Sequence, residues 1–163
     1  MEPQVFRTPM GRPIPDRSGI LPDLMVRTSF RSDGERTLHL ALGDDLDRFR
    51  QVLSGYAAEL RTDSAVSDES FVVTQSMRDT LYARLERERL PLARDTYDAA
   101  GPYVAEQLGY EVTRELFGTE SMVRRQAKGD RQLQAARTSR SAAGNQPEAI
   151  TAAVAAQASG RVR

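Results

Sequence analysis

The sequence of 163 residues contains no cysteine and no tryptophan, and it has one histidine and one lysine. The absence of cysteine excludes a disulfide framework and any zinc site built from thiolates. No apolar run reaches the length of about 18 residues that crossing a bilayer requires, so we predict no membrane span. The segment MEPQVFRTPMG also lacks the basic start and apolar middle of a secretory signal.

The sequence also has no net charge, because its 23 basic and 23 acidic side chains balance. This balance argues against a protein that binds nucleic acid or an acidic membrane through its bulk charge. Arg124, Arg125, Lys128 and Arg131 form a cluster that could contact phosphate. No aromatic residues are interleaved with them, so we expect no nucleic-acid partner.

Residue types that carry chemistry are equally scarce. His39 has no cysteine and no obvious carboxylate partner nearby in the sequence, so we interpret it as structural or solvent-facing. Lys128 lies in the polar segment RQAKGD, where the buried neutral amine of Ser/Lys catalysis is not expected. The sequence contains no P-loop, nucleophile elbow or dinucleotide-binding turn. We therefore assign no catalytic, cofactor-binding or metal-ligating residue.

Residues 5 to 30 favour extended structure. Prolines at positions 9, 13, 15 and 22 are incompatible with a helix interior, and Gly11 and Gly19 indicate turns. The next segment, RSDGER, reads as a polar loop in which Asp33 and Gly34 form a turn. We therefore expect a strand, a turn and a second strand at the start of the chain.

The remainder of the sequence favours helices, because apolar residues recur at steps of three and four. One stripe consists of Leu46, Phe49, Val52, Leu53, Tyr56 and Leu60, and a second of Val73, Met77, Leu81 and Leu85. Asp44 or Asp45 is expected to cap the first helix, and Thr74 or Ser76 the second. The carboxylate pair Glu86 and Glu88 reads as part of a solvated helix face.

A third apolar stripe contains Tyr97, Val104, Leu108, Val112 and Leu116. Gly101 and Pro102 should kink or interrupt this helix, and Pro91 should end the one before it. Gly118 is expected to end the third helix, and Asp130 is expected to cap a last one.

These patterns predict a mainly α fold with a small N-terminal β segment. We divide the chain into a strand and turn region at 1–30, a helical domain at 31–140 and an alanine-rich flexible tail at 141–163. The tail is rich in alanine and offers little apolar surface to bury.

The opening segment resembles the C-terminal processing, or tail-specific, serine peptidases. The family's TPxGRxI segment corresponds to Thr8–Ile14 and its GIxPDxxV segment to Gly19–Val26. The glycine-rich turn between them is replaced here by Pro15-Asp16-Arg17-Ser18. The amphipathic helices that follow also resemble a carboxy-terminal extension found in some of these peptidases, so the resemblance covers about residues 5 to 138.

The resemblance implies a helical extension attached to the end of a peptidase catalytic domain. It implies a bacterial serine endopeptidase that hydrolyses polypeptides, with the helical extension inactive alone because the nucleophilic Ser and general-base Lys have no counterpart here. The expected partners are an upstream catalytic domain and, through it, polypeptide substrates. The resemblance suggests a periplasmic or extracytoplasmic location. The N-terminal strands would expose apolar residues and unpaired edges, so the chain could also self-associate through them.

A different interpretation remains open from the sequence alone. The helices could form an independent module that binds a partner protein through an apolar stripe. This alternative requires no peptidase domain, and the amphipathic pattern by itself does not distinguish it from the first interpretation.

Overall fold

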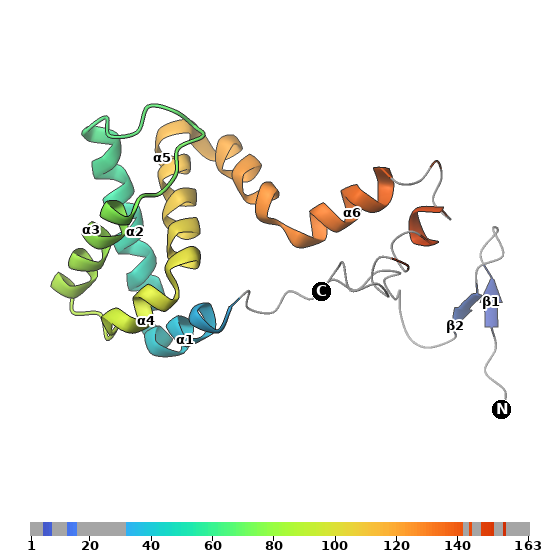
Figure 1. The fold of residues 1–163 in the computed structure, drawn as a ribbon, viewed down its shortest axis with the longest axis horizontal. Helices are drawn as coiled ribbons and strands as arrows, with labels where there is room; N and C mark the ends of the chain where they lie inside the picture. Colours follow the sequence, from blue (N-terminus) through green and yellow to red (C-terminus); the bar gives the residue numbers. More distant parts are fainter. Residues whose placement is uncertain are drawn as a thin grey trace. The chain divides into compact units, whose positions relative to one another are not determined.

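The computed structural model of the chain describes residues 32–141 continuously, together with 144, 148–151 and 155 and the backbone of 5–7 and 13–15. Residues 26–138 belong to one compact unit, which is helical in its described part from residue 32 onward. Figure 1 shows its helices in sequence order from α1 to α6.

The expected fold class, mainly α with a small N-terminal β segment, is wrong, because the continuously described residues 32–141 are helical and contain no strand. The three-residue segments β1 (Val5–Arg7) and β2 (Pro13–Pro15) pair in antiparallel fashion, with Phe6 opposite Ile14. Prolines at both ends of β2 lack an N–H group, so this ladder cannot extend as a regular sheet. A pair this short is marginal alone and provides no β layer.

The helix α1 (Asp33–Leu42) begins within the segment RSDGER, so the expectation of a polar loop there was wrong. Ser32 caps the helix because its hydroxyl accepts a hydrogen bond of 3.1 Å from the amide of Glu35. Gly34 does not form a turn. A Cβ atom at Gly34 would lie 2.1 Å from the carbonyl oxygen of Ala99, so the glycine permits α1 to approach α4 (Arg94–Ala99) closely.

The short 3₁₀ turn η1 (Gly43–Asp45) leads into α2 (Leu46–Thr62), which is followed by α3 (Gln75–Arg87). Asp45 takes the N-cap position of α2, but its carboxylate pairs with Arg48 at 2.7 Å and does not cap the helix. Thr74 caps α3 as predicted, because its hydroxyl accepts a hydrogen bond of 3.2 Å from the amide of Met77.

The long helix α5 (Gly101–Gly129) follows α4 after a break at Ala100, which confirms the interruption expected at Gly101 and Pro102. Gly118 adopts φ 86° and ψ 171°, a conformation that only glycine adopts readily. This non-helical residue divides α5 into two helical halves joined at a bend, at the position where the sequence predicted a helix end. Asp130 caps α6 (Arg131–Ser141), because its carboxylate accepts hydrogen bonds from the amides of Gln132 and Leu133.

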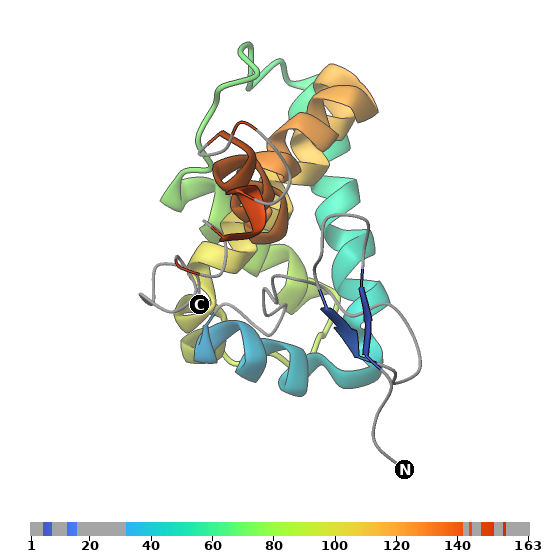
Figure 2. The same ribbon diagram turned by 90° about the vertical axis from the view of Figure 1, so that its right-hand side faces the viewer.

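The hydrophobic core lies between α2 and α5, which form the most extensive helix pair, and α1, α3 and α4 complete it. Figure 2 shows α1 lying across one end of α2. Burying an aliphatic or aromatic side chain of this kind contributes roughly 1.5–3 kcal/mol. The most deeply buried core residues are Leu38, Leu42, Phe49, Leu53, Ala57, Leu81, Leu85, Tyr97, Ala100, Val104, Leu108 and Val112.

Replacing Gly34 by alanine should destabilise the protein by about 1–3 kcal/mol, because the added methyl group would overlap the Ala99 carbonyl and push α1 away from α4. Urea-induced unfolding measures this change. Gly55 in α2 is the matched control, since nothing lies within 4 Å of a Cβ atom at that position. Gly55→Ala should stabilise the helix by roughly 0.5–1 kcal/mol. Equal effects of the two substitutions would refute the close-approach explanation.

Candidate functional site

Arg125, near the C-terminal end of α5, forms hydrogen bonds with the segment that connects α2 to α3. The Arg125 guanidinium donates a hydrogen bond of 3.1 Å to the carbonyl oxygen of Phe71 and one of 3.4 Å to that of Glu69. The same guanidinium lies over the Phe71 ring, 4.4 Å from its centroid. This combination of hydrogen bonds and a cation–π contact fixes the connecting segment against α5.

Arg125 reaches this position because α5 bends at Gly118. In a straight helix, Arg125 and Gly109 would lie about 24 Å apart along the axis. In the structure, a Cβ atom at Gly109 would be 3.1 Å from two nitrogen atoms of the Arg125 guanidinium, and Thr113 Oγ1 lies 3.5 Å from Arg125 Nη1. The bend therefore brings the last turns of α5 back against its own middle.

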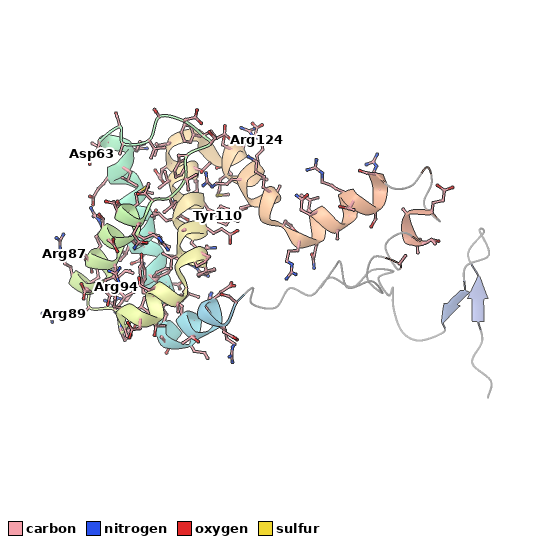
Figure 3. The ribbon with its side chains drawn as sticks, in the orientation of Figure 1. Asp63, Arg87, Arg89, Arg94, Tyr110 and Arg124 are labelled. Carbon is pink, nitrogen blue, oxygen red and sulfur yellow. The ribbon has the colours of Figure 1, made fainter. Side chains whose placement is uncertain are left out.

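Arg125 contributes a partly desolvated charge to this region. Burial lowers the pKa of its guanidinium, which nevertheless stays protonated because arginine does not lose its proton in proteins. Within residues 32–141 no carboxylate forms an ion pair with it. Neighbouring Arg124, by contrast, pairs with Glu120 at 2.6 Å and with Glu69 at 3.4 Å. Figure 3 shows Arg124 where the connecting segment meets α5.

These contacts border an open cleft of about 700 Å³. Val72 is 78% exposed at its edge, and the Phe71 ring forms part of its wall. Tyr110 from the middle of α5 and Lys128 from its end complete the wall, and the Tyr110 hydroxyl donates a hydrogen bond of 2.7 Å to Glu106. The cleft therefore combines apolar, aromatic and charged groups, as protein-binding surfaces do.

The only serine of this cleft is not activated as a nucleophile. The Ser70 hydroxyl donates to Asp68 Oδ1 at 2.6 Å, and the Ser70 amide donates to the same oxygen. These hydrogen bonds hold the pKa of Asp68 below its usual value. A carboxylate with a lowered pKa is a weak general base. The described residues of the cleft therefore offer a binding surface without a nucleophile and base pair.

His39, the single histidine, lies on α1, where its Nε2 is 2.9 Å from the Tyr103 hydroxyl and the two rings are tilted at 57°. Burial raises the pKa of the Tyr103 phenol. Within the part of the chain that the structure describes, no group of three or more histidine and carboxylate side chains could hold a metal ion.

A second, smaller cleft of about 420 Å³ lies between α2 and α3. Arg84 forms a bidentate pair with Glu59, with distances of 2.6 and 2.5 Å, and its guanidinium lies 4.5 Å from the centre of the Tyr56 ring. Arg48 donates to the carbonyl oxygen of Glu88 at 2.5 Å. These arginines are engaged within the bundle.

The structure separates the residues that the sequence singled out. Lys128 is exposed beside the Phe71 cleft, whereas Asp44 and the pair Glu86 and Glu88 are exposed on other helices. Arg125 belonged to a predicted surface cluster, and its role in holding Phe71 was missed. The sequence signal for that role is weak, since it depends on the bend at Gly118.

Comparisons of the chain with protein-family models, with curated proteins and with solved structures found no match. Among the helices that the structure describes, none is both long enough and apolar enough to cross a bilayer. The resemblance to tail-specific peptidases therefore rests on the quoted sequence motif, most of which lies outside the described residues.

Substituting Arg125 by methionine should loosen the connecting segment, because methionine keeps the bulk of the side chain and removes both hydrogen bonds to carbonyl oxygens. Limited proteolysis of the full chain should then cut between residues 64 and 74 at least about tenfold faster, which follows from a loss of local stability near 1.4 kcal/mol. Arg114→Met is the matched control on the same helix. Unchanged cleavage in the Arg125 variant would contradict the role assigned to this side chain.

Proposed function

We propose that this chain is a non-catalytic part of a tail-specific serine peptidase and acts together with a catalytic domain that carries the family's Ser and Lys. The ordered set of residues that matches the family motif carries the proposal. It consists of Phe6, Arg7, Thr8, Gly11, Arg12, Gly19, Ile20, Pro22 and Asp23. The reaction of the whole enzyme would be hydrolysis of peptide bonds in polypeptide substrates.

The geometry of the described residues supports a binding role within that enzyme. The Phe71 cleft presents Val72, the Phe71 ring and the Tyr110 ring beside charged side chains, and Ser70 donates a hydrogen bond to Asp68. A serine peptidase requires a nucleophile and a base that act as a unit, and removal of either member reduces the rate by orders of magnitude. The contribution proposed for this chain is therefore to hold a protein partner.

The purified chain alone should not hydrolyse unstructured peptides, because the motif that it shares with the family does not include the nucleophile or the base. A fluorogenic peptide assay on the full chain measures this directly. Peptide turnover that persists through purification, and that disappears when one of the chain's own serines is replaced by alanine, would contradict the proposal.

The positive test is binding to a catalytic domain of a tail-specific peptidase, measured by calorimetry. Arg12→Ala and Asp23→Ala alter motif positions and should weaken that binding. Arg17→Ala, which lies between the two halves of the motif, is the control and should leave it unchanged. Equal binding by all three variants would remove the motif as the basis of the proposal.

A second candidate function is an independent helical interaction module. The Phe71 cleft favours it, because it combines the exposed Val72 with the Phe71 and Tyr110 rings and with charged side chains, a composition found at protein-binding surfaces. Failure to bind any tail-specific catalytic domain, in a chain whose helices are shown to be folded by circular dichroism, would favour this second function.

A further inference from the structure

The end of the segment that connects α2 to α3 resembles a β-strand, although residues 32–141 contain no strand with which it pairs. Figure 1 shows this segment in green between the two helices. The side chains of Phe71 and Val73 pack against the hydrophobic core, whereas Val72 between them is 78% exposed. Alternation between core and solvent is typical of extended backbone. Thr74, the next residue, is extended as well, with φ −81° and ψ 166°.

The backbone of this segment is only partly hydrogen-bonded. The Phe71 amide donates to the Asp68 carbonyl oxygen at 3.2 Å, and the Phe71 carbonyl oxygen accepts from Arg125 at 3.1 Å. The N–H and C=O groups of Val72 and Val73 have no hydrogen-bond partner within residues 32–141. Unpaired extended backbone is a template to which another extended chain can add.

This unpaired backbone borders the Phe71 cleft. Val72 and Val73 line the cleft of about 700 Å³ together with Ala105 and Tyr110, which belong to the middle of α5. Clefts of roughly 300–1,000 Å³ hold drug-sized ligands, which are comparable in size to a few residues of peptide. The cleft therefore provides room for a short extended chain beside the two unpaired valines.

The charges of the cleft lining restrict what this chain can carry. Three carboxylates and two cations line the cleft, and each carboxylate already has a partner: Asp68 with Ser70, Glu69 with Arg124, and Glu106 with Tyr110. The Arg125 guanidinium donates to carbonyl oxygens. Lys128, by contrast, forms no ion pair or hydrogen bond with any residue of 32–141. The cleft thus complements a chain with one carboxylate placed at Lys128 and no further charge.

We propose that the Phe71 cleft binds an extended segment of a partner polypeptide, which adds as a strand to the backbone of Val72 and Val73. One carboxylate of that segment pairs with Lys128, and an apolar side chain covers Val72. Main-chain hydrogen bonds supply affinity in this binding mode, and side chains supply selectivity. The inference rests on the binding role proposed for this chain and deepens it, because the partner is held as extended chain and not as a folded surface.

The probe for this site is a fluorescent peptide of about eight residues, within the usual length of a strand, in which valine alternates with serine around one glutamate. It should bind the full chain saturably with a Kd below about 1 mM, measured by fluorescence anisotropy. Methylation of the central amide nitrogens of the peptide removes their hydrogen-bond donors and should weaken binding at least about tenfold. Absence of saturable binding, or equal binding of the methylated peptide, would overturn the proposal.

Two substitutions of Val72 test the protein side of the same contact. Val72→Pro removes an N–H group that the unbound chain leaves unpaired, whereas Val72→Thr keeps this group and the branched shape. Because proline is compatible with extended backbone, both variants should unfold at the wild-type temperature. The proline variant should bind the probe at least about tenfold more weakly, and the threonine variant about as tightly as wild type. Equal binding by the two variants would contradict strand addition at Val72. If Val72→Pro does not fold, the methylated peptide decides, since it leaves the protein unchanged.

An exchange of charges tests the role of Lys128. A probe with lysine in place of glutamate should bind the wild type about threefold more weakly, as expected for an exposed ion pair. Lys128→Glu should reverse this preference, whereas Arg87→Glu, which makes the same charge change outside the Phe71 cleft, should keep it. The same preference in wild type and Lys128→Glu would overturn the placement of the carboxylate.

Calorimetry with the catalytic domain separates this inference from the proposed function. Val72→Pro should leave binding through the motif positions Arg12 and Asp23 unchanged. A chain that binds the catalytic domain but not the probe would overturn this inference alone. Self-association in sedimentation equilibrium that Val72→Pro abolishes would also overturn it, because the strand would then add to a second copy of the chain.

Discussion

The bend of α5 at Gly118 is the feature on which the candidate site depends. It brings Arg125 back against Gly109 and Thr113, and Arg125 in turn holds the segment that carries Phe71. Without the bend, the two halves of α5 would form one straight rod and the cleft would lose one wall. The conformation of Gly118 thus determines how α5 and the segment that carries Phe71 together form the cleft.

The bend can have this effect because the first half of α5 is rigidly seated. Val104, Leu108 and Val112 are fully buried in the core that α5 shares with Phe49 and Leu53 of α2. The core fixes where α5 enters the bend, and the bend fixes the position of Arg125 beside the segment that carries Phe71. The position of the cleft within the helical unit is therefore a consequence of core packing.

The sequence predicted helix caps and interruptions correctly where these depend on residues that are neighbours in the chain. Thr74 and Asp130 cap their helices as expected, and Gly101 with Pro102 interrupts the chain as expected. The β segment was wrongly included in the fold class, because prolines mark extended backbone but do not supply the partners that a sheet requires. Gly34 was read as a turn, since its actual role depends on a neighbour, Ala99, that lies far along the chain.

The candidate site was less predictable than the helices. Arg125 and Phe71 are separated by 54 residues in sequence, and their contact exists only after α5 has bent. The sequence indicated that Gly118 would end a helix but could not indicate the direction in which the chain continues.

Amide hydrogen exchange of Gly118→Ala tests the central claim most directly. An alanine cannot readily adopt φ 86° and ψ 171°, so the substitution should cost about 1–3 kcal/mol or straighten the helix. We expect exchange at Phe71, whose amide bonds to the Asp68 carbonyl oxygen, to accelerate while exchange in the middle of α2 stays slow. If exchange at Phe71 is unchanged in this variant, the bend does not build the cleft.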